Sequence, residues 1–150
     1  MVIYIDADAM PSVIRDILFR AAERTKTPVV LVSNMPLKYP ASPLISSIVV
    51  PSGPDEADHK IAEMVQSGDL VITADIPLAG RAIAKGGTVI DPRGVVYSEI
   101  NIKERLTMRN FMEELRNSGI DTGGPPPFTP KDAKSFADKL SGILSRKKTT

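Results

Sequence analysis

Three carboxylates stand directly after short apolar segments, where a buried β-strand would end. Asp6 and Asp8 follow residues 2–5, and Asp75 follows residues 70–73. In an open parallel sheet, ligands bind beyond the carboxyl ends of the strands, because the loops diverge there and helix N-termini point inward. If the chain stays extended between them, Asp6 and Asp8 point the same way, with their backbones about 6.6 Å apart. The spacing predicts an acidic cluster at one edge of a sheet.

A predicted helix over residues 55–66 supplies two more acids. Asp58 shares the apolar stripe of this helix, and Asp55 lies at the margin of the same face. The helix dipole favours acids in a first turn by about 0.3 to 1 kcal/mol each, which accounts for Asp55. It does not account for an inward acid at position 58, where an apolar side chain would pack better. We therefore expect Asp58 to face the cluster.

Carboxylates without thiolate or imidazole partners suit hard divalent cations. The chain has no cysteine and a single histidine, which excludes a thiolate zinc site and a histidine-rich centre. Converging carboxylates prefer Mg²⁺ or Mn²⁺, and such a site can activate water for phosphoryl transfer. We expect five metal ligands: Asp6, Asp8, Asp55, Asp58 and Asp75. All of them except Asp55 are also candidate catalytic residues.

Simpler structural roles compete for three acids. Asp8 and Asp75 each precede a proline suited to a first helical turn, so either could serve as a helix cap. Both alternatives stay open. Asp91 begins the sequence Asp-Pro-Arg-Gly, which is typical of a type I turn, and we interpret Asp91 as structural.

Phosphate binding needs hydrogen-bond donors near the same edge. Asn34 ends the second predicted strand and could orient water or phosphate, although a turn role fits equally well. Four arginines are candidates for bidentate phosphate contacts, although most surface arginines only solvate a face: Arg81, Arg93, Arg109 and Arg116. His59 could shuttle protons, but we expect a solvated helix residue there.

The elements that would position these side chains follow from apolar periodicity. Five β-branched runs are typical of buried parallel strands: residues 2–5, 29–32, 48–50, 70–73 and 88–90. Helical patterns are expected at residues 11–24, 55–66, 77–85 and 103–118, and from 130 onward. Strands alternating with helices imply an α/β fold, a parallel sheet of about five strands flanked by helices. The last helix is expected to dock on the sheet.

Length and composition limit the remaining possibilities. At 150 residues, we expect one domain over residues 1–145 and a basic, frayed tail over 146–150. A net charge of +1 gives no strong global attraction to nucleic acid or to an anionic membrane, so any nucleic-acid site must be local. No apolar run reaches the roughly 18 residues of a membrane span, and we expect a cytoplasmic protein without a membrane partner. A homodimer is compatible with the sequence.

Several stretches resemble the bacterial YaiI/YqxD family. They cover nearly the whole chain: IDADAMP at 5–11, VPSGPDEADHKI at 50–61, GDLVITADIPLAG at 68–80, DPRG at 91–94 and MRNFMEELRNSGIDTGGPPPF at 108–128. That family is grouped with the PIN-like nuclease domains. The resemblance implies a PIN-like, Rossmann-like sheet with an acidic divalent-metal site.

The resemblance also implies roles for single residues. Asp6 resembles the acid after the first PIN strand, and Thr73 with Asp75 resembles the Thr-x-Asp after the fourth, so we expect Thr73 to help bind substrate. Asp55 or Asp58 stands where PIN domains place a helix acid. That acid is usually Glu, which is the one departure from the pattern.

The leading hypothesis is a Mg²⁺- or Mn²⁺-dependent nuclease acting on RNA. A phosphatase of the haloacid dehalogenase type is the alternative enzyme, because Asp6-x-Asp8 matches that group's nucleophile and acid, with Ser33 as phosphate ligand. A third hypothesis is a non-catalytic protein that binds metal or RNA.

Overall fold

The computed structural model describes residues 1–8, 10–123 and 126–147, and these ranges form an α/β fold with one six-stranded sheet. Its strands are β1 (Ile3–Asp6), β2 (Val29–Ser33), β3 (Ile45–Val49), β4 (Leu70–Ile72), β5 (Thr88–Ile90) and β6 (Val96–Tyr97). The spatial order is β3-β2-β1-β4-β5-β6, with β6 antiparallel to β5 and every other pair parallel. The two central strands, β1 and β4, are therefore neighbours, and their carboxyl ends meet at one edge.

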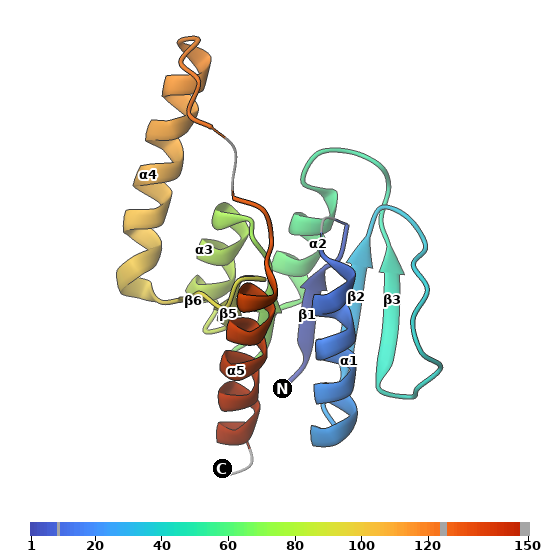
Figure 1. Cartoon of the computed structure of the whole chain (residues 1–150). Coiled ribbons are helices and arrows are strands. Elements are labelled where there is room, and N and C mark those ends of the chain that lie inside the picture. Colours follow the sequence, from blue (N-terminus) through green and yellow to red (C-terminus); the bar gives the residue numbers. More distant parts are fainter. Residues whose placement is uncertain (9, 124–125, 148–150) are drawn as a thin grey trace.

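Five helices cover the two faces of the sheet (Figure 1). They are α1 (Ser12–Thr25), α2 (Glu56–Met64), α3 (Ile76–Ala84), α4 (Glu99–Asn117) and α5 (Pro130–Lys147). Helices α1 and α5 pack together on one face, α2 and α3 pack on the other, and α4 lies against α3. In the described ranges, no helix has both the length and the apolar character needed to cross a bilayer.

The sheet differs from the predicted one in two places. Strand β6 was not predicted, because two residues are too short to show a periodic pattern. Strand β3 begins at Ile45 rather than at residue 48, and two serines, Ser46 and Ser47, lie inside it. As the edge strand of the sheet, β3 does not need the continuous apolar sequence of a buried strand.

Helix α4 begins earlier than the predicted residue 103. Ser98 caps it by accepting a hydrogen bond from the backbone N–H of Asn101, while the Asn101 side chain accepts one from the Ser98 N–H. Asparagine replaces the Glu or Gln usual at this position of a capping box, so the start was missed.

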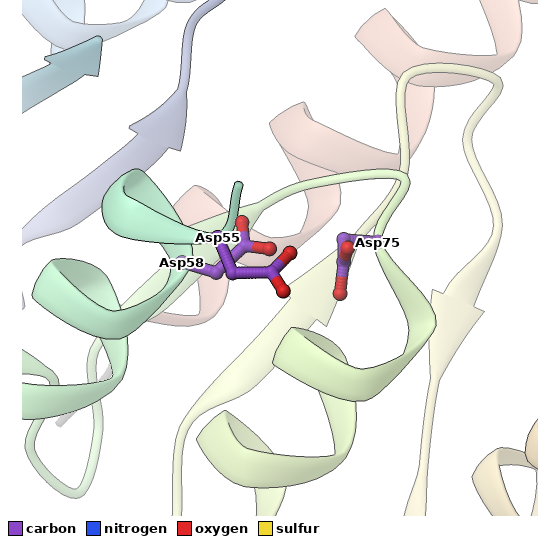
Figure 2. A group of neighbouring side chains, drawn as sticks. All are labelled: Asp55, Asp58 and Asp75. Carbon is purple, nitrogen blue, oxygen red and sulfur yellow. The ribbon is translucent and has the colours of Figure 1, made fainter. Parts of the chain in front are cut away.

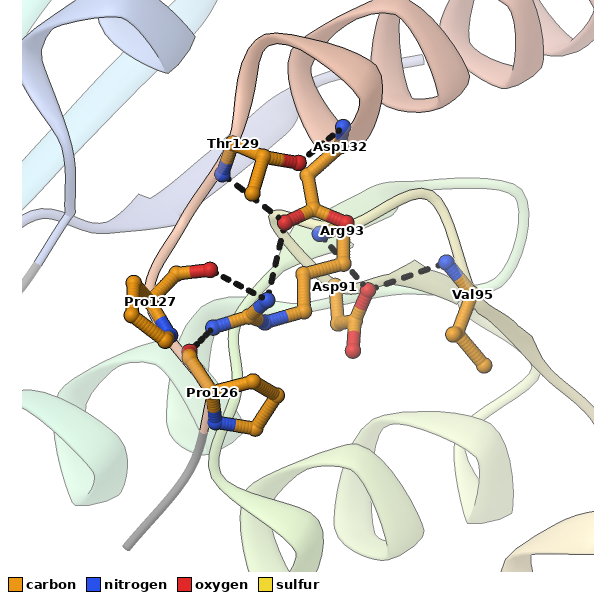
Figure 3. A network of polar contacts seen from close by, with 7 residues as sticks. All are labelled: Asp91, Arg93, Val95, Pro126, Pro127, Thr129 and Asp132. Atoms are coloured by element: carbon orange, nitrogen blue, oxygen red, sulfur yellow. Dashed lines mark hydrogen bonds and ion pairs between the residues drawn. The ribbon is translucent and has the colours of Figure 1, made fainter.

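The predicted docking of the C-terminal helix is confirmed. Phe136 and Leu140 are almost completely buried between α1 and the sheet. Arg93 fastens the start of α5 to the turn between β5 and β6, because its guanidinium donates to Asp132 at 2.8 Å and to the carbonyl oxygens of Pro126 and Pro127 (Figure 3). Helix α5 continues through Lys147, and the remainder of the predicted frayed tail, residues 148–150, lies outside the described residues.

Candidate functional site

Parallel pairing of β1 with β4 brings Asp6 beside Thr73. The Thr73 hydroxyl donates to Asp6 Oδ2 at 3.2 Å and accepts a hydrogen bond from the backbone N–H of Asp75 at 3.0 Å. Thr73 is completely buried, so its side chain positions the two acids and offers no surface to a substrate. We therefore revise its expected role from substrate binding to positioning.

Three acids from two helix starts converge at this edge (Figure 2). Asp55, Asp58 and Asp75 each present a carboxylate oxygen, and these oxygens all lie within 4.8 Å of one another. Asp75 is the N-cap of α3, and its Oδ1 accepts from the Leu78 N–H at 2.8 Å, so its predicted capping role is confirmed and coexists with membership of the cluster. Asp55 is the N-cap residue of α2, but its side chain makes no capping hydrogen bond. Its backbone has a φ of 65°, in the left-handed region that aspartate tolerates better than most residues.

The cluster is electrostatically strained. Burial, followed by the charges of Asp75 and Asp6, a hydrogen bond with Asp75 and the charge of Asp55, raises the pKa of Asp58 from 3.8 to about 7. Burial also raises the pKa of Asp6, and the hydrogen bond from Thr73 partly opposes this shift. A divalent cation would relieve this repulsion, and an all-oxygen donor set suits such an ion. The residues present therefore fit a metal ion.

The three acids share a cavity of about 150 Å³ with two arginines and a histidine. Arg81, Arg109 and His59 line it together with the acids, as do Pro77 and Leu78. Arg81 Nη1 lies 2.9 Å from His59 Nδ1, and because a guanidinium only donates, the imidazole nitrogen accepts. Two of the four arginines singled out from the sequence, Arg81 and Arg109, thus lie at the acidic site, while Arg93 pairs with Asp132.

The sequence predicted a solvated helix residue at His59, which lines the cavity instead. Its position next to Asp58 at the start of the same helix could have indicated a place at the site. The partner that fixes its orientation, Arg81, belongs to another helix and could not be inferred from helix phase.

Asp8 and Asn34 form a separate contact beside the cluster. Both carboxylate oxygens of Asp8 accept from the Asn34 backbone N–H, at 2.8 and 2.9 Å. The alternative that Asp8 caps the first helix is not seen, because α1 begins after Pro11 without a side-chain cap. Asp8 thus ties the end of β1 to the end of β2, and its charge still contributes to raising the pKa of Asp6.

Two further residues have structural roles. Asp91 Oδ1 accepts from the backbone N–H groups of Arg93 and Val95, each at 2.9 Å, which confirms the predicted turn (Figure 3). Ser33 is completely buried, and its hydroxyl donates to the Met35 carbonyl oxygen at 2.6 Å. A phosphate ligand at Ser33, as the phosphatase alternative requires, is not available in this arrangement.

Comparisons with known proteins identify the family. No solved structure matches the chain. The family model described as "Uncharacterized BCR, YaiI/YqxD family" matches residues 4–146. A UPF0178 protein of Cronobacter sakazakii is 54% identical over 148 residues, which cover 99% of this chain and 98% of the relative. Another from Klebsiella pneumoniae is 56% identical over 144 residues, with coverages of 96% and 95%, and one from Burkholderia ambifaria is 53% identical over 146 residues, with 97% of each. The chain therefore belongs to the YaiI/YqxD family.

Proposed function

We propose that this protein is a metal-dependent phosphodiesterase with a PIN-like arrangement, and that it hydrolyses RNA. The observation that carries the proposal is a single cavity in which Asp55, Asp58 and Asp75 lie together with Arg81 and Arg109. Carboxylates suit a divalent cation, and guanidinium groups suit the phosphate that such a cation would contact. A binding site for uncharged ligands would need neither the carboxylates nor the guanidinium groups.

Mg²⁺ or Mn²⁺ is the proposed ion, held by Asp55, Asp58 and Asp75. When bound, it would supply a polarised water and charge stabilisation at the phosphate. Thr73 holds Asp6 beside this set, and Asp6 contacts Asp58 through a side-chain hydrogen bond and adds its negative charge.

The protein's own residues would bind and orient the substrate. Arg81 and Arg109 would neutralise the phosphate oxygens, and His59 would hold the Arg81 guanidinium in place through Nδ1. The cavity is small, at about 150 Å³, and none of the described residues that line it is Phe, Tyr or Trp. It would therefore admit the phosphodiester while the bases stay outside, so we expect hydrolysis with little dependence on base sequence.

Hydrolysis of labelled single-stranded RNA and DNA by the purified protein, in Mn²⁺ or Mg²⁺ and in EDTA, tests the proposal. We expect cleavage with metal only, and losses of about 100-fold or more for Asp58→Asn and Asp75→Asn. Asp138→Asn is the matched control, because it removes an exposed carboxylate on α5 that pairs, within the described part of the chain, only with Lys134. Circular dichroism shows whether each variant is folded.

Two outcomes would contradict the proposal. Equal cleavage by folded Asp58→Asn and by the wild type would place the activity elsewhere. Calorimetric binding of Mn²⁺ without turnover of any nucleic acid would leave only the non-catalytic alternative.

A further inference from the structure

Helix α4 runs from the amino-terminal ends of the parallel strands (the amino edge of the sheet) past their carboxyl-terminal ends (the carboxyl edge). Because β6 is antiparallel to the rest, it ends at the amino edge, and α4 starts there and runs antiparallel to α3 toward the carboxyl edge. Gly80 of α3 marks the contact, since a Cβ built there would lie 3.7 Å from Leu106 Cδ1 and 3.8 Å from Ile102 Cγ1. The C-terminal half of α4 then extends beyond α3 (Figure 1).

Where the face of α4 that packs on α3 leaves the core, it carries two arginines, Arg109 and Arg116, with Glu113 between them. Arg109 follows Ile102 and Leu106 on this face and lines the acidic cavity beside Asp75. Arg116 is seven residues further, which is about 10.5 Å along the axis and within about 20° of the same direction. Within the described ranges, Arg116 is exposed and makes no ion pair, whereas Arg109 pairs with Glu113 at 3.3 Å. A guanidinium without a partner thus stands two turns past the cavity, on the cavity side.

We infer that this face of α4 is a binding track for the phosphate backbone of a single-stranded nucleic acid whose scissile phosphate lies in the acidic cavity. The inference rests on the proposed function and adds which surface of the protein holds the strand beside the scissile phosphate. Even a stacked strand, rising about 3.4 Å per phosphate, needs about three nucleotides to span from Arg109 to Arg116. Continuity with the cavity and the complementary charge select this occupant over an apolar partner.

Binding measurements can test the track apart from catalysis. Fluorescence anisotropy compares fluorescein-labelled uridine oligomers of twelve and two nucleotides, of which the shorter cannot reach from Arg109 to Arg116, in Ca²⁺ and in EDTA. We expect the wild type to prefer the longer oligomer. Arg116→Ala removes most of this preference and lowers the salt slope of binding by about 0.7, as expected for one phosphate contact to a single strand. Arg116→Lys retains the preference, because the charge remains.

Lys103→Ala is the matched control, because it removes one charge from the same helix on the side away from α3. The track is refuted if Lys103→Ala and Arg116→Ala weaken binding equally, if oligomer length has no effect, or if a glutamate peptide of twelve residues competes as well as the oligonucleotide. If the longer oligomer binds through Arg116 but nothing is hydrolysed, the track stands and the proposed activity fails.

Discussion

Replacing Asp58 with asparagine should stabilise the metal-free protein, and more so at higher pH. The pKa of Asp58 is raised to about 7 in the folded chain, against 3.8 ordinarily. Above pH 7 the carboxylate is charged in both the folded and the unfolded state, and the folded state carries the full unfavourable energy of burial and repulsion. As pH falls from 7 toward 4, the folded state takes up the proton first, and the penalty disappears. Asparagine keeps the shape and never carries the charge.

The size of the effect follows from the shift. About three pKa units correspond to at most about 4 kcal/mol. Because the cavity opens to solvent and ions screen the charges, we expect about 2 kcal/mol near pH 8. For a chain of this length, that is an increase of about 4 to 8 °C in Tm. Near pH 4.5 the difference between variant and wild type should be much smaller.

Urea unfolding followed by circular dichroism in EDTA, near pH 8 and near pH 4.5, measures both differences. Glu104→Gln is the control, because it removes an exposed charge on α4 and should change stability little at either pH. The reasoning is refuted if Asp58→Asn gains nothing near pH 8. An equal gain at both pH values would also refute it, because the cause would then not be charge.

Two further predictions concern residues that position the site and the last helix. Thr73→Val should lower the free energy of unfolding by about 1 to 3 kcal/mol, because it leaves the Asp75 N–H and Asp6 Oδ2 without a buried partner. Thr73→Ser keeps the hydroxyl and should retain most of this stability, so equal stability of the two variants would contradict the prediction. Arg93→Ala should lower the free energy of unfolding by about 1 to 2 kcal/mol and speed amide hydrogen exchange at the start of α5. Lys134→Ala breaks an exposed pair and should change this exchange little, so equal exchange in the two variants would show that Arg93 does not fasten the helix.

Local patterns anticipated most of the secondary structure. Apolar spacing correctly predicted β1, β4, β5 and α5, because buried residues recur at the period of a strand or a helix. Elements without such a spacing of apolar residues were missed. Strand β6 has two residues, and the first turns of α4 depend on an asparagine in its capping box.

The sequence by itself determined that acids would gather at the carboxyl edge, because strand ends and helix phase are local properties. Only the tertiary structure decided which acids meet. Asp55 and Asp58 join Asp75, Asp6 is hydrogen-bonded to Thr73 and Asp58, and Asp8 accepts from the Asn34 backbone. These partners lie 17 to 67 positions apart in the chain, and a difference of a few ångströms in how two helices and two strands pack decides whether their oxygens can share one ion. The periodicity of apolar residues along the sequence carries no information about such a difference.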